Sequence, residues 1–170
     1  RYGIPHYRLP KNIVDRVETA LTAMGVEFRM NTEIGRDVAI ENIVERYDKV
    51  YLATGAWKQP VIGLGGEELT EFGLNFLVEV NTYLQKAIGN DVLVCGGGNV
   101  AMDVALTAKR LGAKTVKLVC RKRKEDLSAS PEELARVIEE GVEIYDCRGL
   151  RNVITDENGK VTGLHTVRCY

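Results

Sequence analysis

The sequence from Asp91 to Lys124 predicts a strand, a glycine turn, a helix, a second strand and a basic cluster, in that order. The apolar run Val92–Cys95 is typical of a buried strand. Gly96, Gly98 and Ala101 follow it with the spacing G-x-G-x-x-G/A. Small residues at these positions permit a tight turn, close approach of the backbone to a diphosphate, and close packing of helix on strand. The pattern therefore predicts a dinucleotide-binding turn, formed by Gly96, Gly97, Gly98, Asn99, Val100 and Ala101.

The residues after this turn predict a helix that begins near Asn99 and stops at Gly112. One apolar face recurs at helical spacing, made of Val100, Ala101, Val104, Ala105, Ala108 and Leu111. The free N–H groups and the positive dipole end of such a helix would face bound phosphates. Asn99 can cap the helix or contact a phosphate, and Asp103 is expected to have a dipole or structural role rather than a substrate contact. A glycine turn with a purely structural role is the alternative.

The second strand, Thr115–Cys120, ends in a basic cluster. Units that bind NAD carry an Asp or Glu roughly 20 residues after the turn, which bonds the ribose hydroxyls. Positions 116–121 contain no acid, and Arg121, Lys122 and Arg123 stand at this strand end. A guanidinium can bind a 2′-phosphate bidentately, whereas a carboxylate would repel it. The cluster predicts NADP(H) in preference to NAD(H); a solvated basic loop or a weak nucleic-acid patch is the alternative.

The remaining patterns predict an α/β protein with a Rossmann-like parallel sheet, helices on both faces, and a small antiparallel β-hairpin. Ser130-Pro131 begins a helix with a capping box closed by Glu133. Asn158-Gly159 predicts the hairpin turn. The expected helices span about 11–24, 41–46, 74–84 and 130–141, and the other expected strands are Val26–Met30, Val50–Ala53 (buried), Val142–Asp146 and a hairpin over 150–168.

Composition narrows the class of protein. The chain is 45% hydrophobic and 28% charged with a net charge of −1, so it has no overall attraction to nucleic acid or to an anionic membrane. It has no apolar run of membrane-span length, and we expect a cytoplasmic protein without a membrane span. The four cysteines form no C-x-x-C pair, which argues against a metal site. Cys95 and Cys120 are expected to be small buried residues, and His6 and His165 are isolated.

Several segments together resemble a known family. They are Gly3-Ile4-Pro5 with Tyr7-Arg8-Leu9-Pro10, Gly25-Val26-Glu27-Phe28, Tyr47-Asp48 with Ala53-Thr54-Gly55-Ala56, GGGNVAMDVALTAKRLGA at 96–113, the Arg121 cluster, and SASPEE at 128–133. In this order they resemble the flavin oxidoreductases related to the small (β) subunit of bacterial NADPH-dependent glutamate synthase. That group includes the NADPH-side region of dihydropyrimidine dehydrogenase and the transhydrogenase-type ferredoxin oxidoreductases.

The resemblance implies a two-dinucleotide fold in which an NADPH domain is inserted into an FAD domain. Hydride would pass from NADPH to FAD, and electrons would leave through an iron–sulfur domain or subunit of the same complex, with a possible oligomer. Residues 1–60 would be a section of the FAD-binding domain, with Thr54, Gly55 and Ala56 beside the flavin nucleotide. Residues 61–170 would form the NADP(H)-binding domain. We expect a piece of a longer polypeptide that binds NADP(H) but, by itself, FAD poorly or not at all.

The chain departs from the family pattern at two places, and two other functions are alternatives to a flavin oxidoreductase. Gly65-Gly66-Glu67 stands where the family commonly has P-G-E, and Cys120 where it often has Tyr. No catalytic residue is assigned, because in hydride transfer the cofactors carry the chemistry. A non-catalytic NADP(H)-binding or sensing module is the main alternative. A flavin-free Rossmann dehydrogenase is disfavoured, since no Tyr-x-x-x-Lys pair follows the glycine helix.

Overall fold

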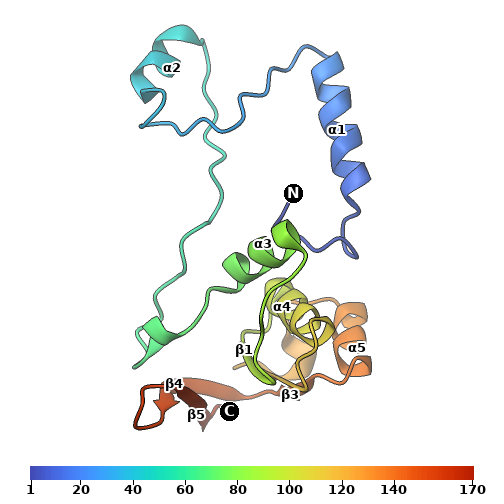
Figure 1. Ribbon diagram of the computed structural model, residues 1–170, viewed down its shortest axis with the longest axis vertical. Helices are drawn as coiled ribbons and strands as arrows, with labels where there is room; N and C mark the ends of the chain where they lie inside the picture. Colours follow the sequence, from blue (N-terminus) through green and yellow to red (C-terminus); the bar gives the residue numbers. More distant parts are fainter. The chain divides into compact units, whose positions relative to one another are not determined.

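The computed structural model describes residues 1–170, which divide into two compact units (Figure 1). Unit 1 contains Arg1–Pro10 and Gln59–Tyr170, and unit 2 contains Lys11–Lys58. The first ten residues therefore pack in the same unit as the glycine turn, although a stretch of 48 residues, the whole of unit 2, separates them from the rest of that unit in the sequence.

Unit 1 is built on a three-stranded parallel sheet in the order β1-β2-β3. The strands are β1 (Asp91–Cys95), β2 (Thr115–Val119) and β3 (Glu143–Tyr145), and they are connected by α4 (Asn99–Arg110) and α5 (Pro131–Glu139). Parallel neighbours joined through a helix are βαβ units, because parallel strands need a long crossover connection. The predicted order of strand, turn, helix and strand is confirmed.

Two further elements complete unit 1. The antiparallel hairpin of β4 (Arg148–Thr155) and β5 (Val161–Arg168) forms a separate sheet, and α3 (Gly73–Tyr83) packs on α4. Two short 3-10 turns are η1 (Glu67–Leu69) and η2 (Lys124–Asp126). The predicted α/β class, with a parallel sheet, packed helices and a small antiparallel hairpin, is confirmed.

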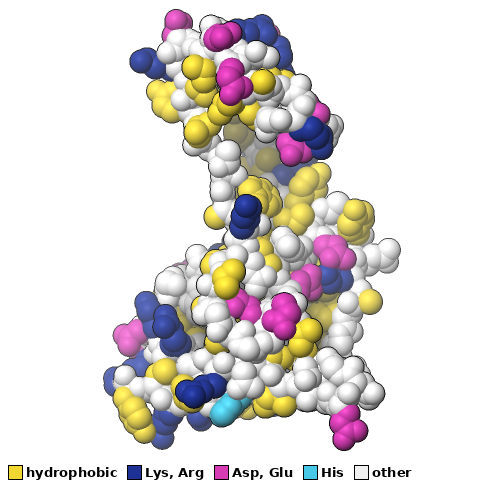
Figure 2. Space-filling model, turned by 90° about the vertical axis from the view of Figure 1, so that its left-hand side faces the viewer, with side chains coloured by type: hydrophobic (Ala, Val, Ile, Leu, Met, Phe, Trp, Pro, Cys, Tyr) yellow, Lys and Arg dark blue, Asp and Glu magenta, His cyan; other side chains and the backbone are white.

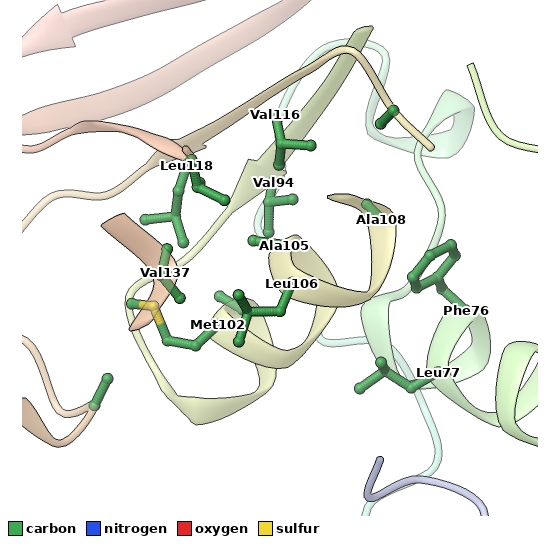
Figure 3. Packing of buried hydrophobic residues seen from close by; sticks show 14 of the residues in the cluster. Phe76, Leu77, Val94, Met102, Ala105, Leu106, Ala108, Val116, Leu118 and Val137 are labelled. Carbon is green, nitrogen blue, oxygen red and sulfur yellow. The ribbon is translucent and has the colours of Figure 1, made fainter. Parts of the chain in front are cut away.

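The core of unit 1 lies around α4 (Figure 3). Met102 and Leu106 are fully buried, and in Figure 3 they lie among Val94 and Leu118 of the sheet and Val137 of α5. The predicted apolar face is only partly right: Ala101, Ala105 and Ala108 are buried, whereas Val100 is exposed. The sequence pattern predicted a helix that is covered on one face only. In the structure α4 contacts the sheet, α3 and α5, so it is buried on more than one face.

The start of α5 has the predicted capping box. The Ser130 Oγ accepts a hydrogen bond from the N–H of Glu133 at 3.2 Å, and the Glu133 carboxylate accepts one from the N–H of Ser130 at 3.3 Å. Pro131 takes the first helical position, where no N–H is needed. These contacts satisfy two N–H groups that the helix itself leaves unpaired.

The loop at Gly65-Gly66-Glu67 is fixed by its own glutamate. The Glu67 carboxylate accepts hydrogen bonds from the N–H groups of residues 62, 63 and 64. The N–H of Val153 in β4 donates to the carbonyl of Gly65 at 2.8 Å. The segment is therefore folded around a carboxylate and attached to the hairpin, which gives it a structural role.

Unit 2 contains α1 (Lys11–Ala23), α2 (Ile40–Arg46) and irregular connections, and none of its residues is buried. Figure 2 shows apolar side chains on the surface in the upper part of the view, where α1 and α2 lie in Figure 1. The exposed apolar residues of unit 2 include Val17, Met24, Val44 and Tyr51. Unit 2 has no core of its own. None of the helices in the chain has the length and apolar character needed to cross a membrane.

Two predicted strands are absent from unit 2. Val26–Met30 and Val50–Ala53 are irregular, and the latter is exposed rather than buried, with Tyr51 at 90%. A strand persists only where a neighbouring strand satisfies its N–H and C=O groups. Unit 2 offers only one isolated bridge, between Ile34 and Val38. The apolar runs therefore meet the compositional condition for strands but lack a pairing partner.

Candidate dinucleotide site

The glycine turn lies at the junction of β1 and α4, as predicted. Gly96 follows the strand with a φ of +140°, a conformation that residues with a side chain rarely adopt. Its N–H donates to the carbonyl of Val119 at 2.9 Å, which ties the turn to β2. A Cβ at Gly96 would lie 3.3 Å from the Cβ of Ala101. The small residues at both positions therefore allow the helix to begin close to the strand.

The other two glycines of the turn pack against the segment that precedes α5. A Cβ at Gly97 would lie 2.5 Å from a methyl carbon of Leu127 and 3.3 Å from the Cβ of Cys120. A Cβ at Gly98 would lie 3.4 Å from Ser128 Oγ, and that hydroxyl donates to the carbonyl of Gly97 at 3.5 Å. Residues 127–128 thus form one wall of the turn, and a side chain at Gly97 would displace the Leu127 methyl group.

The first turn of α4 has N–H groups available for an anion. Gly98 is the N-cap residue and has no side chain to accept from them. The N–H groups of Ala101 and Met102 donate to the carbonyl of Gly98, at 3.0 and 3.2 Å. Asn99 and Val100 are exposed. Because they lie in the first turn, their N–H groups have no hydrogen-bond acceptor within the helix. Since Asn99 is the first helical residue, it does not cap α4, and its phosphate contact stays a prediction.

Arg121 lies at the same edge of the sheet as the turn. Cys95 pairs with Val119 in parallel register, so β1 and β2 end side by side, and Arg121 comes two residues after β2. The backbone on either side of it is held: the N–H of Cys120 donates to Tyr145 O at 3.0 Å, and the N–H of Cys147 donates to Lys122 O at 3.3 Å. The side chains of Arg121, Lys122 and Arg123 are exposed, and none of them forms an ion pair in the structure. Their charges are available to a phosphate.

The two cysteines of the adjoining strands differ from each other. Cys120 is buried as predicted, and this burial raises the pKa of its thiol. Cys95 is exposed, so the prediction that it is buried was wrong. Successive strand side chains alternate between faces, and β1 is an edge strand with Val94 turned into the core. Cys95 therefore falls on the uncovered face with Leu93.

The predicted flavin-contacting residues lie elsewhere, in unit 2. Thr54, Gly55 and Ala56 are exposed, and no strand precedes them. Gly55 has a φ of +72° and packs beside the Trp57 indole. Their contact with FAD stays a prediction.

A cluster of polar side chains that the sequence did not reveal lies on the first half of α4. Asp103 is 5% exposed. Its Oδ1 accepts hydrogen bonds from the Tyr7 hydroxyl at 3.0 Å and from Arg8 Nε at 2.9 Å. The structural role expected for Asp103 is confirmed, although its partners lie 95 and 96 residues away in the sequence. No local spacing could have identified them.

The same cluster extends to α5. Arg8 forms an ion pair with Glu133, and the guanidinium of Arg110 lies 4.2 Å from the centre of the Tyr7 ring. Arg110 in turn pairs with Glu140 after α5. Arg8 therefore connects the N-terminal segment to both crossover helices.

Comparisons with known proteins agree with this geometry. Residues 38–167 match the family model described as pyridine nucleotide-disulphide oxidoreductase. The chain is 34% identical over 171 residues to the NADPH-Fe(3+) oxidoreductase subunit beta of Geobacter sulfurreducens. It is 34% identical over 181 residues to the glutamate synthase [NADPH] small chain of Escherichia coli K12. It is 36% identical over 171 residues to the NADP(+)-dependent formate dehydrogenase subunit beta of Moorella thermoacetica.

Each of these alignments covers 98% of this chain, but the chain spans only 25%, 38% and 24% of the three relatives, respectively. The family match covers more than half of the chain, including the glycine turn, the basic cluster and the hairpin. The chain therefore belongs to the pyridine nucleotide-disulphide oxidoreductase family of enzymes.

Proposed function

We propose that unit 1 binds NADP(H) and that the intact protein passes hydride from NADPH to FAD and on to iron–sulfur centres. The observation that carries this proposal is that the glycine turn and the basic cluster of Arg121, Lys122 and Arg123 stand at the same edge of one parallel sheet. In open α/β sheets ligands bind at the carboxyl ends of the strands.

Each part of the site has a role in this proposal. The diphosphate would rest on the N–H groups at the start of α4, among Gly96, Gly97, Gly98, Asn99, Val100 and Ala101. Arg121 would hold the 2′-phosphate of the adenosine, assisted by Lys122 and Arg123. The buried Cys120 would form part of the wall behind the adenosine. Bound NADPH supplies a hydride, while the residues of this chain bind and orient the nucleotide.

The names of the relatives support the NADP(H) half of the proposal. All three carry NADPH or NADP(+) in their names, whereas the second reaction differs: Fe(3+) reduction, glutamate synthesis and formate oxidation. The three relatives share this segment and the nucleotide in their names but differ in the other substrate, which favours a role for the segment in nucleotide binding. Two of these relatives are named as beta subunits and one as a small chain, which supports a partner subunit. In our proposal, a domain or subunit of the same complex carries the iron–sulfur centres.

The flavin half concerns residues 1–60, which we propose to be a section of the FAD domain; the first ten of these residues pack in unit 1, and the rest of the section up to Lys58 is unit 2. Unit 2 buries none of its apolar side chains, as expected for part of a larger domain. Thr54, Gly55 and Ala56 would then contact the flavin nucleotide in the intact protein, and residues 61–170 would supply the NADP(H) domain.

Nucleotide titration tests the first half. NADPH should bind more tightly than NADH, and Arg121→Ala should weaken NADPH binding by roughly 1.5–3 kcal/mol through loss of charge-assisted hydrogen bonds, with NADH nearly unchanged. Lys114→Ala is a matched control, because Lys114 is an exposed cation just before β2, at the opposite end of that strand. Equal affinity for the two nucleotides would refute the role of Arg121.

The intact protein tests the second half. It should purify with the visible absorption of an oxidised flavin, and NADPH should bleach that absorption. An intact protein that binds NADPH but purifies without flavin would instead support the NADP(H)-sensing module.

A further inference from the structure

We propose that Arg8 is a positioning residue for the dinucleotide turn, an inference that rests on the NADP(H) site proposed above. Arg8 is far from the turn in sequence, and nothing in the glycine pattern identifies it. Its side chain is 25% exposed and is held between two helices. The geometry points to a clamp that holds one wall of the nucleotide site in place.

The clamp joins the early parts of α4 and α5. Arg8 Nε donates to Asp103 Oδ1 at 2.9 Å, and Arg8 Nη2 forms an ion pair with the same oxygen at 2.8 Å. Its Nη1 pairs with Glu133. Asp103 is the fifth residue of α4 and Glu133 the third of α5. The two carboxylates would repel each other without the guanidinium between them, so Arg8 sets the distance between these helix ends.

A short chain of contacts leads from Glu133 to the glycine turn. Glu133 is bonded both ways to Ser130 in the capping box. Ala129 is buried. The two residues before it, Leu127 and Ser128, are the ones that lie against Gly97 and Gly98. A shift of Glu133 would therefore move the wall that contacts the turn.

That wall lies in direct contact with the turn. A methyl carbon of Leu127 occupies the place where a Gly97 side chain would be, and Ser128 Oγ reaches the Gly97 carbonyl at 3.5 Å. A site whose N–H groups are held in position before the ligand arrives binds more tightly, since less ordering is needed on binding. Arg8 would contribute this order without touching the nucleotide.

The fold supplies a matched control for this clamp. Arg110, the last residue of α4, pairs with Glu140 just after α5. This second pair joins the same two helices at their other ends, beyond the Leu127–Ser130 segment. Glu133→Gln and Glu140→Gln each remove one carboxylate charge paired with an arginine, and Gln at 133 can still complete the capping box.

The experiment measures the dissociation constant of NADPH for the intact protein and for four variants: Arg8→Gln, Glu133→Gln, the double variant of these two, and Glu140→Gln. Each single change in the clamp should weaken NADPH binding roughly 3- to 20-fold, as coupling through a packed network typically does. The double variant should be no worse than the weaker-binding single variant, because both changes break one pair. Glu140→Gln should change the constant less than about twofold.

Amide hydrogen exchange provides a readout that general destabilisation would not reproduce. In Arg8→Gln, exchange should accelerate at Gly97–Val100 while the buried amides of β2 keep their protection. The inference is overturned if Arg8→Gln and Glu133→Gln bind NADPH like Glu140→Gln, or if their effects multiply in the double variant. Failure of the unaltered protein to bind NADPH would refute the proposed function, and this inference with it.

Discussion

Replacing Asp103 by Ala should destabilise unit 1 far more than a typical surface change. The carboxylate is almost completely buried and accepts hydrogen bonds from Tyr7 and Arg8. The substitution would remove the acceptor of the phenolic O–H and of part of the guanidinium, and only the Thr107 side chain would remain hydrogen-bonded to the phenol. An unpaired buried polar group costs more than the net contribution of the bond that it has lost.

The magnitude follows from what remains after the change. Breaking a buried ion pair costs about 3–5 kcal/mol. Arg8 is a quarter exposed and keeps Glu133, so we place Asp103→Ala at the lower end, about 3 kcal/mol. Asp103→Asn retains the Oδ1 acceptor and loses only the charge, and should cost about 1–2 kcal/mol. Tyr7→Phe should cost about 1 kcal/mol.

Native-state hydrogen exchange of the α4 amides measures this free energy within unit 1. A double-mutant cycle with Tyr7→Phe and Asp103→Ala isolates the hydrogen bond between them, and its interaction energy should exceed about 0.5 kcal/mol. If Asp103→Ala lies within about 0.5 kcal/mol of the unaltered protein, as exposed substitutions do, the buried network does not contribute to stability and the reasoning fails.

Three further predictions concern unit 1. Burial raises the pKa of Tyr7 above its ordinary value of 10.0. Above about pH 10 the folded form therefore keeps a proton that the unfolded chain loses, and the free energy of unfolding should fall as the pH rises. Tyr7→Phe should make this fall smaller, as measured by urea titrations at several pH values. The hydrogen bond from Arg110 lowers the pKa of Glu140 below its ordinary 4.5. The Glu140 carboxylate therefore stabilises the fold above pH 4.5, and this stabilisation is lost as the pH falls through the lower pKa of the folded state. Glu140→Gln should lose less stability than the unaltered protein below about pH 4.5. Leu106→Ala, at a fully buried position, should cost about 2.7–5 kcal/mol by urea unfolding, whereas Leu84→Ala, at an exposed one, should cost less than about 0.5 kcal/mol.

The elements that could be predicted from the sequence are those specified by neighbouring residues. The run before Gly96, the helix after it and the capping box at Ser130 each depend on contacts within a few positions, and the structure has all three. The βαβ connection then makes the two strands adjacent and parallel, because a strand, a helix and a second strand in succession form neighbouring parallel strands. The meeting of the glycine turn and Arg121 at one sheet edge was therefore predictable.

The predictions that failed depend on a partner that sequence patterns do not specify. Val50–Ala53 has the composition of a buried strand but no neighbour in unit 2 to pair with, and it is exposed. Cys95 belongs to a correctly predicted strand, yet its exposure depends on whether anything covers that face of β1. Strand propensity describes how well a side chain fits a half-covered surface, and it does not supply the cover.

The candidate site depends on both local contacts and contacts between residues far apart in the sequence, and these two kinds of contact would determine different properties. The choice between NADPH and NADH would depend on Arg121, which is placed by local elements and could be predicted from the sequence. Affinity would depend in part on Arg8, which reaches the site through contacts across 95 residues of sequence and through Glu133 of a second helix. A substitution at Arg121 should therefore change the preference between NADPH and NADH. A substitution at Arg8 should weaken both nucleotides by the same factor, because the turn that it supports holds the diphosphate common to the two.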